Sequence, residues 1–205
     1  TGFGDLRVRA SINFTGAPSL EPQDFSSYAP KTVTGLGVQV IIPTGNYKPE
    51  QLPNLGSNRW SVRATYGLSR TFEKWVLEGF VGAWFFSDNK EFLVNNTLEQ
   101  SSLWVLKGNI IRSFNQQGMW LAFSTGYGYG AETYINGVKR DAIISQLRLG
   151  LTYMLPLSKK HSLKFSVNSG IRFQEGADFD LFGFSYSYMW LDKNKKKQLQ
   201  KTSKQ

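Results

Sequence analysis

Residues 182–190 read Phe-Gly-Phe-Ser-Tyr-Ser-Tyr-Met-Trp. Aromatic side chains stand at every second position of this stretch, with smaller or slimmer residues between them: Phe182, Phe184, Tyr186, Tyr188 and Trp190. A period of two residues indicates a β-strand whose two faces differ in chemistry. Such a row of rings is unusual filling for a soluble core. It suits a strand face in contact with lipid, where amphipathic rings gather near the headgroups.

The same alternation can be traced in nine segments, at roughly residues 5–14, 34–42, 60–69, 75–86, 103–113, 119–129, 142–155, 162–173 and 179–190. These segments are long, because strands of globular proteins average about 5–6 residues whereas a tilted membrane strand needs about 9–11. The segment 75–86 is apolar on both faces, so its register stays open. We predict an all-β fold, an antiparallel transmembrane up-and-down β-barrel.

The composition is compatible with this fold. Of the 205 residues, 40% are apolar and 15% are aromatic, yet the mean hydropathy is −0.32. A barrel in which every second residue faces water has this balance, although a soluble all-β protein could share it. No apolar run is long enough for a transmembrane helix. The absence of cysteine excludes thiol catalysis, disulfides and thiolate metal sites.

The connections alternate in length over the C-terminal part of the chain, and the long connection at residues 15–31 breaks the pattern. Short turns lie at residues 70–74, 114–118 and 156–161, and longer loops lie at 44–58, 87–102 and 130–141. Outer-membrane barrels have short periplasmic turns and longer external loops, so this alternation predicts a periplasmic C-terminus. Bacterial barrels have an even number of strands, and Thr1 begins in mid-pattern. We therefore expect an odd number of further strands before Thr1.

The charge is concentrated at one end. The net charge is +9, and the tail from Lys193 to Gln205 holds six lysines and no acid. We expect residues 1–190 to form the barrel and residues 191–205 to form a basic, disordered tail. No recognition motif for nucleic acid accompanies the charge, so we expect no nucleic-acid partner. A protein partner could bind this tail.

Several phrases are similar to those of one outer-membrane family. They are Gly-Phe-Gly-Asp-Leu-Arg-Val at residues 2–8, Pro-Thr-Gly-Asn-Tyr at 43–47, Asn-Leu-Gly-Ser-Asn-Arg-Trp at 54–60, Gly-Ala-Trp-Phe-Phe-Ser-Asp-Asn at 82–89, Leu-Pro-Leu at 155–157 and Gly-Ala-Asp-Phe-Asp at 176–180. Their order and spacing resemble the transporters labelled "putative meta-pathway of phenol degradation", from Gly2 to Trp190. The extension after Trp190 departs from the pattern, because such barrels end at the aromatic residue.

The resemblance implies a bacterial outer-membrane channel of about twelve strands, nine of them in this chain, that admits small organic solutes, aromatic or anionic ones among them. It also implies that the aromatic row at residues 182–190 acts as a signal for the barrel assembly machinery. The family supplies no catalytic, cofactor or metal residues, so none is assigned. The alternative is a plugged barrel that anchors partner proteins through its loops or tail. A soluble β-barrel binding protein is a third hypothesis.

If the apolar face contacts lipid, the opposite face lines a lumen. Basic residues dominate that face: Arg7, Arg9, Arg63, Lys107, Arg148, Lys164 and Arg172. The acids that we place there are Glu78 and Asp5. A basic lumen attracts anions over about one Debye length, roughly 8 Å in physiological salt. Alternatively, the inward charges pair across strands and close a narrow barrel.

Other candidate sites are weaker. Phe80, Trp84 and Trp120 could form an inward slot for a ring-bearing solute, or they could be lumen packing. The pair Arg59-Trp60 lies at the outer rim, where we expect an anchor in place of a ligand site. The single histidine, His161, falls in a short turn at the opposite rim, so we predict no hydrolase and no enzyme.

Overall fold

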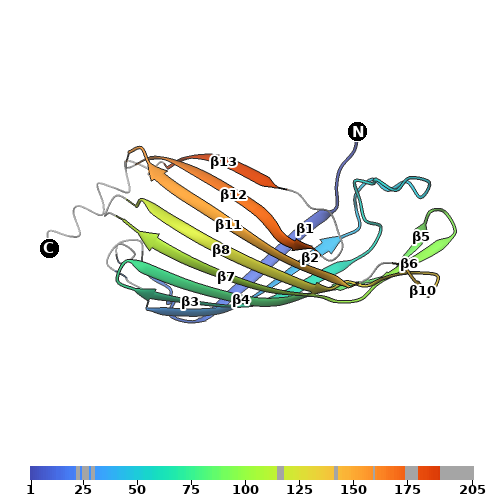
Figure 1. Ribbon diagram of the computed structural model, residues 1–205, viewed down its shortest axis with the longest axis horizontal. Coiled ribbons are helices and arrows are strands. Elements are labelled where there is room, and N and C mark those ends of the chain that lie inside the picture. The colour runs from blue at the N-terminus through green and yellow to red at the C-terminus, as the bar shows by residue number, and fades with distance from the viewer. Residues whose placement is uncertain are drawn as a thin grey trace.

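The computed structural model describes residues 1–21, 24, 28, 31–114, 118–140, 143–158, 160–173 and 180–189. Nine long strands follow one another: β1 (Leu6–Thr15), β2 (Thr32–Ile42), β3 (Ser61–Phe72), β4 (Trp75–Phe86), β7 (Leu103–Ser113), β8 (Trp120–Gly130), β11 (Ile144–Pro156), β12 (His161–Phe173) and β13 (Leu181–Tyr188). They form one antiparallel sheet in this same order, and Figure 1 shows it as a curved wall. The nine predicted strands are therefore confirmed. Trp190 and the tail lie outside the described residues.

The wall has two chemically different faces. Register places Leu36, Tyr66, Val81, Leu106 and Tyr127 in one row across five strands. Their side chains are 39–59% exposed. The intervening positions of β3 carry polar or small residues on the opposite side, as expected for a strand with period two. Val81 belongs to this row and therefore faces outward. This settles which face of β4 points outward, a question that its sequence left open.

No second layer of protein covers the apolar face in the described part of the chain. Three alanines are the buried apolar residues there: Ala83, Ala122 and Ala131. The aromatic row of β13 stays open, since Phe182 is 77% exposed and Phe184 is 67% exposed. A soluble sandwich would enclose such rings between two sheets. Within the described ranges, no helix is long and apolar enough to cross a membrane.

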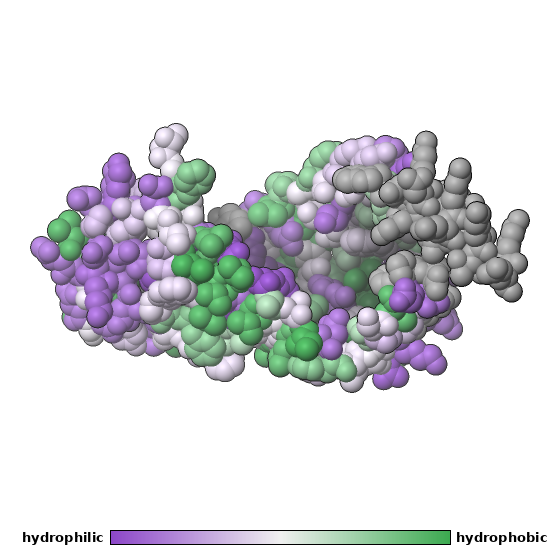
Figure 2. Space-filling view, turned by 180° about the vertical axis from the view of Figure 1, so that it is seen from behind, coloured by the Kyte–Doolittle hydropathy of each residue, from purple (hydrophilic) through white to green (hydrophobic). Residues whose placement is uncertain are grey.

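The connection between β4 and β7 and the connection between β8 and β11 were expected to be loops without strands, and this expectation is wrong. They contain β5 (Asn89–Phe92), β6 (Asn96–Gln100), β9 (Thr133–Ile135) and β10 (Val138–Lys139), which pair in a four-stranded sheet in the order β10-β9-β6-β5. These strands are too short to show a period of two residues. We call this element the rim sheet. Figure 1 shows it beyond one end of the wall, and Figure 2 shows that this end is mostly hydrophilic.

Two irregularities interrupt the long sheet. The register between β1 and β2 shifts between Asn13 and Thr15. The register between β11 and β12 also shifts, between Leu147 and Arg148, so that Leu147 pairs with Arg172 and Arg148 pairs with Gly170. A bulge of this kind breaks the strict alternation of faces. The inward position predicted for Arg172 therefore stays a prediction, because its side chain lies outside the described residues.

Replacing Leu106 by arginine tests whether the apolar face contacts lipid. The Leu106 side chain is 59% exposed at the middle of β7. An arginine near the middle of a bilayer costs a barrel about 2–4 kcal/mol. We expect the Leu106→Arg variant to lose this much in denaturant unfolding from phospholipid vesicles. The control is Val105→Arg on the opposite face, for which the expected loss is below about 1 kcal/mol. Equal losses would contradict the assignment of faces.

Candidate functional site: a basic lumen with a second cavity at its mouth

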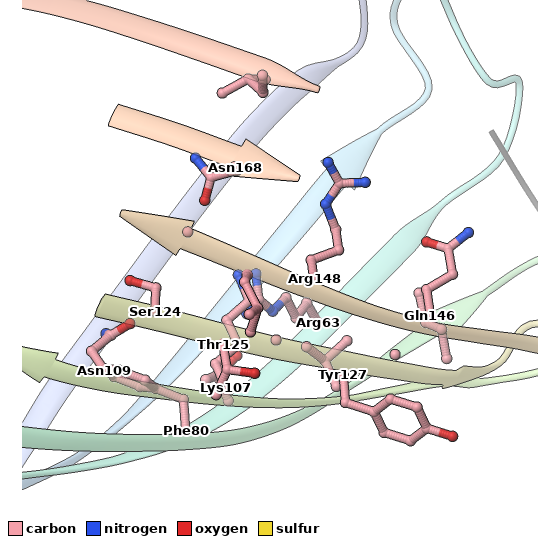
Figure 3. Close-up of a pocket in the computed structure, with 18 of the residues that line it drawn as sticks. Arg63, Phe80, Lys107, Asn109, Ser124, Thr125, Tyr127, Gln146, Arg148 and Asn168 are labelled. Carbon is pink, nitrogen blue, oxygen red and sulfur yellow. The ribbon is translucent and has the colours of Figure 1, made fainter. Parts of the chain in front are cut away.

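The concave face of the wall encloses a cavity of about 740 Å³. Eight of the long strands contribute to its lining. Its charged and polar residues include Arg9, Arg63, Lys107, Asn109, Ser124, Gln146, Arg148 and Asn168. In Figure 3, Arg148 and Gln146 extend to one side of β11, whereas the ring of Tyr127 points away from the cavity. The predicted lumen side chains Arg9, Arg63, Lys107 and Arg148 thus meet in one space.

Strand register explains why these cations gather. Arg9 pairs with Gln39, which pairs with Arg63, so two arginines lie two strands apart in one row. Lys107 and Arg148 occupy another row, separated by Gly126. Two strand spacings are about 10 Å, a distance that long side chains can shorten. The four cations therefore lie on one face of the wall and line one cavity.

The positive charges of this lumen cluster are not all cancelled by acids. Within the described ranges, the side chains of Arg9, Arg63 and Lys107 form no ion pair; the ion pair found there, Lys139–Glu132, belongs to the rim. The inward acid Glu78 accepts a hydrogen bond of 2.8 Å from Asn109 Nδ2. Among the described residues, Arg9, Arg63 and Lys107 thus show none of the cross-strand ion pairs that would help to plug the barrel.

An aromatic platform on β4 orients the arginine at the centre of the lumen cluster. The guanidinium of Arg63 lies 5.6 Å from the ring centroid of Trp84, its partner across the strand pair. Among the described residues, Arg63 Nε has no hydrogen-bond partner although it is buried. Stacking on a ring therefore holds this guanidinium while leaving a donor available.

Glycines on the inner face leave room beside the charges. The ring of Phe80 lies directly over Gly67, its cross-strand partner, because a Cβ atom at Gly67 would come within 2.7 Å of the ring. Phe80 is thus pressed against the wall and lines the cavity. Of the other predicted slot residues, Trp84 holds Arg63. Trp120 pairs with Met154 at the opposite end of β8, ten positions from Gly130, which lies in the row of Arg63 and Trp84. The three rings do not converge on one slot.

The remaining predicted residues lie elsewhere along the wall. Arg7 lines a second cavity at the mouth. Lys164 pairs with Met154 and Ser185 toward the end with short turns, and its side chain is exposed. Glu78 pairs with Asn109, two residues along the strands from the pair of Phe80 and Lys107. The aromatic row of β13 has the outward position that its pattern predicted as far as Tyr188.

The second cavity, of about 570 Å³, reveals a residue that the sequence analysis did not assign to a site. Its lining includes Asp5, Arg7, Tyr47, Arg59, Ser61 and Phe92. Arg59 was expected to be a rim anchor, but most of its guanidinium is enclosed, and this burial lowers the pKa of Arg59. The sequence contained a signal for this position. Arg59, Ser61 and Arg63 stand at every second residue, so the alternation of faces predicts that Arg59 points inward as Arg63 does.

A carboxylate clasp holds the connection after β2 against the start of β1. Asp5 accepts hydrogen bonds from the N–H of Gly45 at 2.9 Å and from the N–H and hydroxyl of Ser57 at 2.8 and 2.7 Å. Partial burial raises the pKa of the Asp5 carboxyl. The hydrogen bonds and the charge of Arg7 outweigh this effect, so the pKa lies below its usual value.

Comparison with known proteins identifies the family. A family model described as "Putative MetA-pathway of phenol degradation" matches residues 1–188. The chain belongs to this family. The resemblance seen in the sequence motifs is thereby confirmed. None of the curated proteins matches the chain in sequence.

A solved structure shows the fold of this family member. The crystal structure of an outer membrane channel from Pseudomonas putida F1 superimposes with a TM-score of 0.75 at 23% sequence identity. The match covers 92% of this chain and 66% of the channel. The predicted fold class, an antiparallel β-barrel of the outer-membrane type, is confirmed. This chain spans about two thirds of the length of that channel.

The clasp gives a pH-dependent prediction. Because the pKa of Asp5 is lowered in the folded chain, its stabilising contribution is full above the unfolded value of about 4 and is lost as the pH falls through the folded value. At neutral pH, we expect the Asp5→Asn variant to raise amide hydrogen exchange of residues 45–57 about fivefold, equivalent to roughly 1 kcal/mol for one lost charged hydrogen bond. Asp88→Asn, at an exposed rim carboxylate, is the control. Unchanged protection in Asp5→Asn would show that the clasp does not hold this connection.

Proposed function

We propose that this protein is an outer-membrane channel for small organic solutes and that its lumen prefers anions. The observation that carries the proposal is the gathering of Arg9, Arg63, Lys107 and Arg148 around one cavity on the concave face, opposite an apolar face. The family, and the fold shared with an outer membrane channel of Pseudomonas putida F1, support the same function.

The field inside such a lumen favours negative solutes. Cations held on low-dielectric walls focus their potential into the space between them, which raises the local concentration of anions and lowers that of cations. Lumen charges within a few ångströms of the path act at separations below one Debye length, so salt screens them only in part. The polar side chains of Asn109, Ser124, Gln146 and Asn168 can replace part of the hydration shell of a passing solute.

The topology supports a definite orientation in the membrane. We place the rim sheet and the connections after β2, β4 and β8 outside the cell, and the short turns, together with the end of β13, in the periplasm. Within the described residues, β1 and β13 each have one neighbour in the sheet. Because lipid leaves no strand edge unpaired, we propose that the complete barrel has further strands between these edges, about twelve in all.

Charge reversal in the lumen tests the channel and its selectivity together. We expect steady single-channel conductance in planar bilayers and a reversal potential in a KCl gradient that indicates anion preference. Lys107→Glu and Arg63→Glu should each lower the chloride-to-potassium permeability ratio at least about threefold, equivalent to roughly 0.7 kcal/mol.

Lys74→Glu is the matched control for Lys107→Glu. It makes the same change of charge in the exposed turn between β3 and β4, away from the lumen. The permeability ratio of this control should equal that of the unmodified protein. Bilayers that stay silent in every protein would refute the channel and favour the plugged structural barrel. Conductance that ignores the lumen charges would refute the anion preference.

A further inference from the structure

The cavity at the mouth has the residues of a binding site in its own right. It lies between the segment before β1, the connection after β2 and the rim sheet. One part of its lining is apolar and comes from Ile41, Leu52, Leu55, Phe92 and Leu98. Arg7 and Arg59 bring two positive charges to the same space. Such a mixed lining, with a few polar groups on an apolar wall, is typical of sites for small molecules.

Arg59 is held in place by two contacts that do not neutralise it. Its Nη2 donates a hydrogen bond of 2.6 Å to Gln100 Oε1, and its guanidinium carbon lies 4.7 Å from the ring centroid of Phe86. Gln100 is itself anchored, since its Nε2 donates to the carbonyl oxygen of Ala131 at 3.3 Å. A chain of contacts from the rim sheet therefore fixes the direction of this guanidinium before any ligand binds.

The other terminal nitrogen of Arg59, Nη1, makes no such contact with a described residue. In the part of the chain that the structure describes, Nη1 is buried and has no hydrogen-bond partner. A buried donor on a charged group costs free energy unless an acceptor reaches it. Because Arg59 lines the cavity, an anion that binds its guanidinium there would supply an acceptor, and a carboxylate matches the fork of donors on a guanidinium.

Two acids at this end of the wall, Asp5 and Glu91, are already engaged. Asp5 lines the cavity, but the hydrogen bonds of the clasp occupy its two oxygens. Glu91 Oε2 accepts a hydrogen bond from Asn58 at 3.2 Å. Within the described ranges, neither acid forms an ion pair with Arg59. Arg7 and Arg59 each carry a positive charge and Asp5 carries one negative charge, so the lining of the cavity has a net positive charge.

The position of the cavity connects it with the lumen cluster. Arg7 precedes Arg9 by two residues on β1, and Arg59 precedes Arg63 by four residues on the inward side of the chain entering β3. At about 3.3 Å per residue, these steps are roughly 7 and 13 Å. A solute leaving the mouth therefore meets the next pair of cations within a short distance.

We propose that this cavity is a capture site for small organic monocarboxylates, in which Arg59 binds the carboxylate with help from Arg7 and the apolar wall receives the ring or alkyl body. The site deepens the proposed channel function and rests on it: bound solute passes from Arg59 to the lumen cluster. Binding at the mouth raises the solute concentration at the entrance, and modest affinity lets the solute leave toward the lumen.

Benzoate is the probe, and benzamide, a neutral molecule of similar shape, is its comparison. We expect the purified protein in detergent to bind benzoate more tightly than benzamide by isothermal titration calorimetry. Arg59→Gln should weaken benzoate binding at least tenfold and leave benzamide binding unchanged. The matched control is Arg140→Gln, which removes an arginine from the same end of the molecule outside the cavity. Heat-modifiable migration in gels confirms that each variant is folded.

The outcomes separate this site from the channel function. If Arg59→Gln binds benzoate as the unmodified protein does while Lys107→Glu still alters ion selectivity, the capture site is refuted and the channel stands. If benzoate binding depends on Arg59 but bilayers stay silent, the site stands and the channel is refuted. Should Arg59→Gln not fold, crystals of the unmodified protein with 4-bromobenzoate decide the question. Anomalous bromine density in the cavity at the mouth supports the site, and density confined to the lumen, or none, refutes it.

Discussion

The structure depends on one continuous antiparallel sheet, in which backbone hydrogen bonds join nine strands. In hydrocarbon, no water is present to bond a free N–H or carbonyl, so a chain that crosses lipid as strands must pair each strand with its neighbours. The pairing also fixes the side chains, because successive residues of a strand point to opposite faces. One constraint therefore decides both the lipid-facing surface, with Leu106 and Tyr127, and the lumen, with Lys107 and Arg148. A one-residue slip would exchange the two sets.

The same constraint explains the small residues of the inner face. Gly37, Gly67, Gly82, Gly126 and Gly128 lie on rows with the polar lumen residues. A larger side chain at Gly67 would displace the ring of Phe80. Because the wall is thin at these positions, long cationic side chains from neighbouring strands can extend into the lumen. Glycine has the same role on the wall of β8, where Gly126 separates Lys107 from Arg148.

The sequence predicts what depends on local periodicity and misses what depends on contacts between distant segments. The strands and the lumen cluster could be predicted, since the alternation around Arg63, Lys107 and Arg148 is visible within each strand. The rim sheet could not, because strands of two to five residues contain too little pattern. Its order depends on non-local polar contacts, such as those of Asn89, which is 1% exposed and bonds to Tyr47 and Asn58. The burial of Arg59 follows from the same long-range packing.

Strand β4 holds two arginines in fixed positions without neutralising their charge. Trp84 and Phe86 stack with their rings 8° from parallel and carry Arg63 and Arg59 respectively. An acid in the place of each ring would hold the guanidinium as firmly but would cancel its charge and occupy its donors. A ring attracts the cation through its quadrupole and leaves the edge of the guanidinium open. The aromatic pair on β4 thus aligns a cation of the mouth cavity with a cation of the lumen cluster, and each keeps a donor that no described residue satisfies.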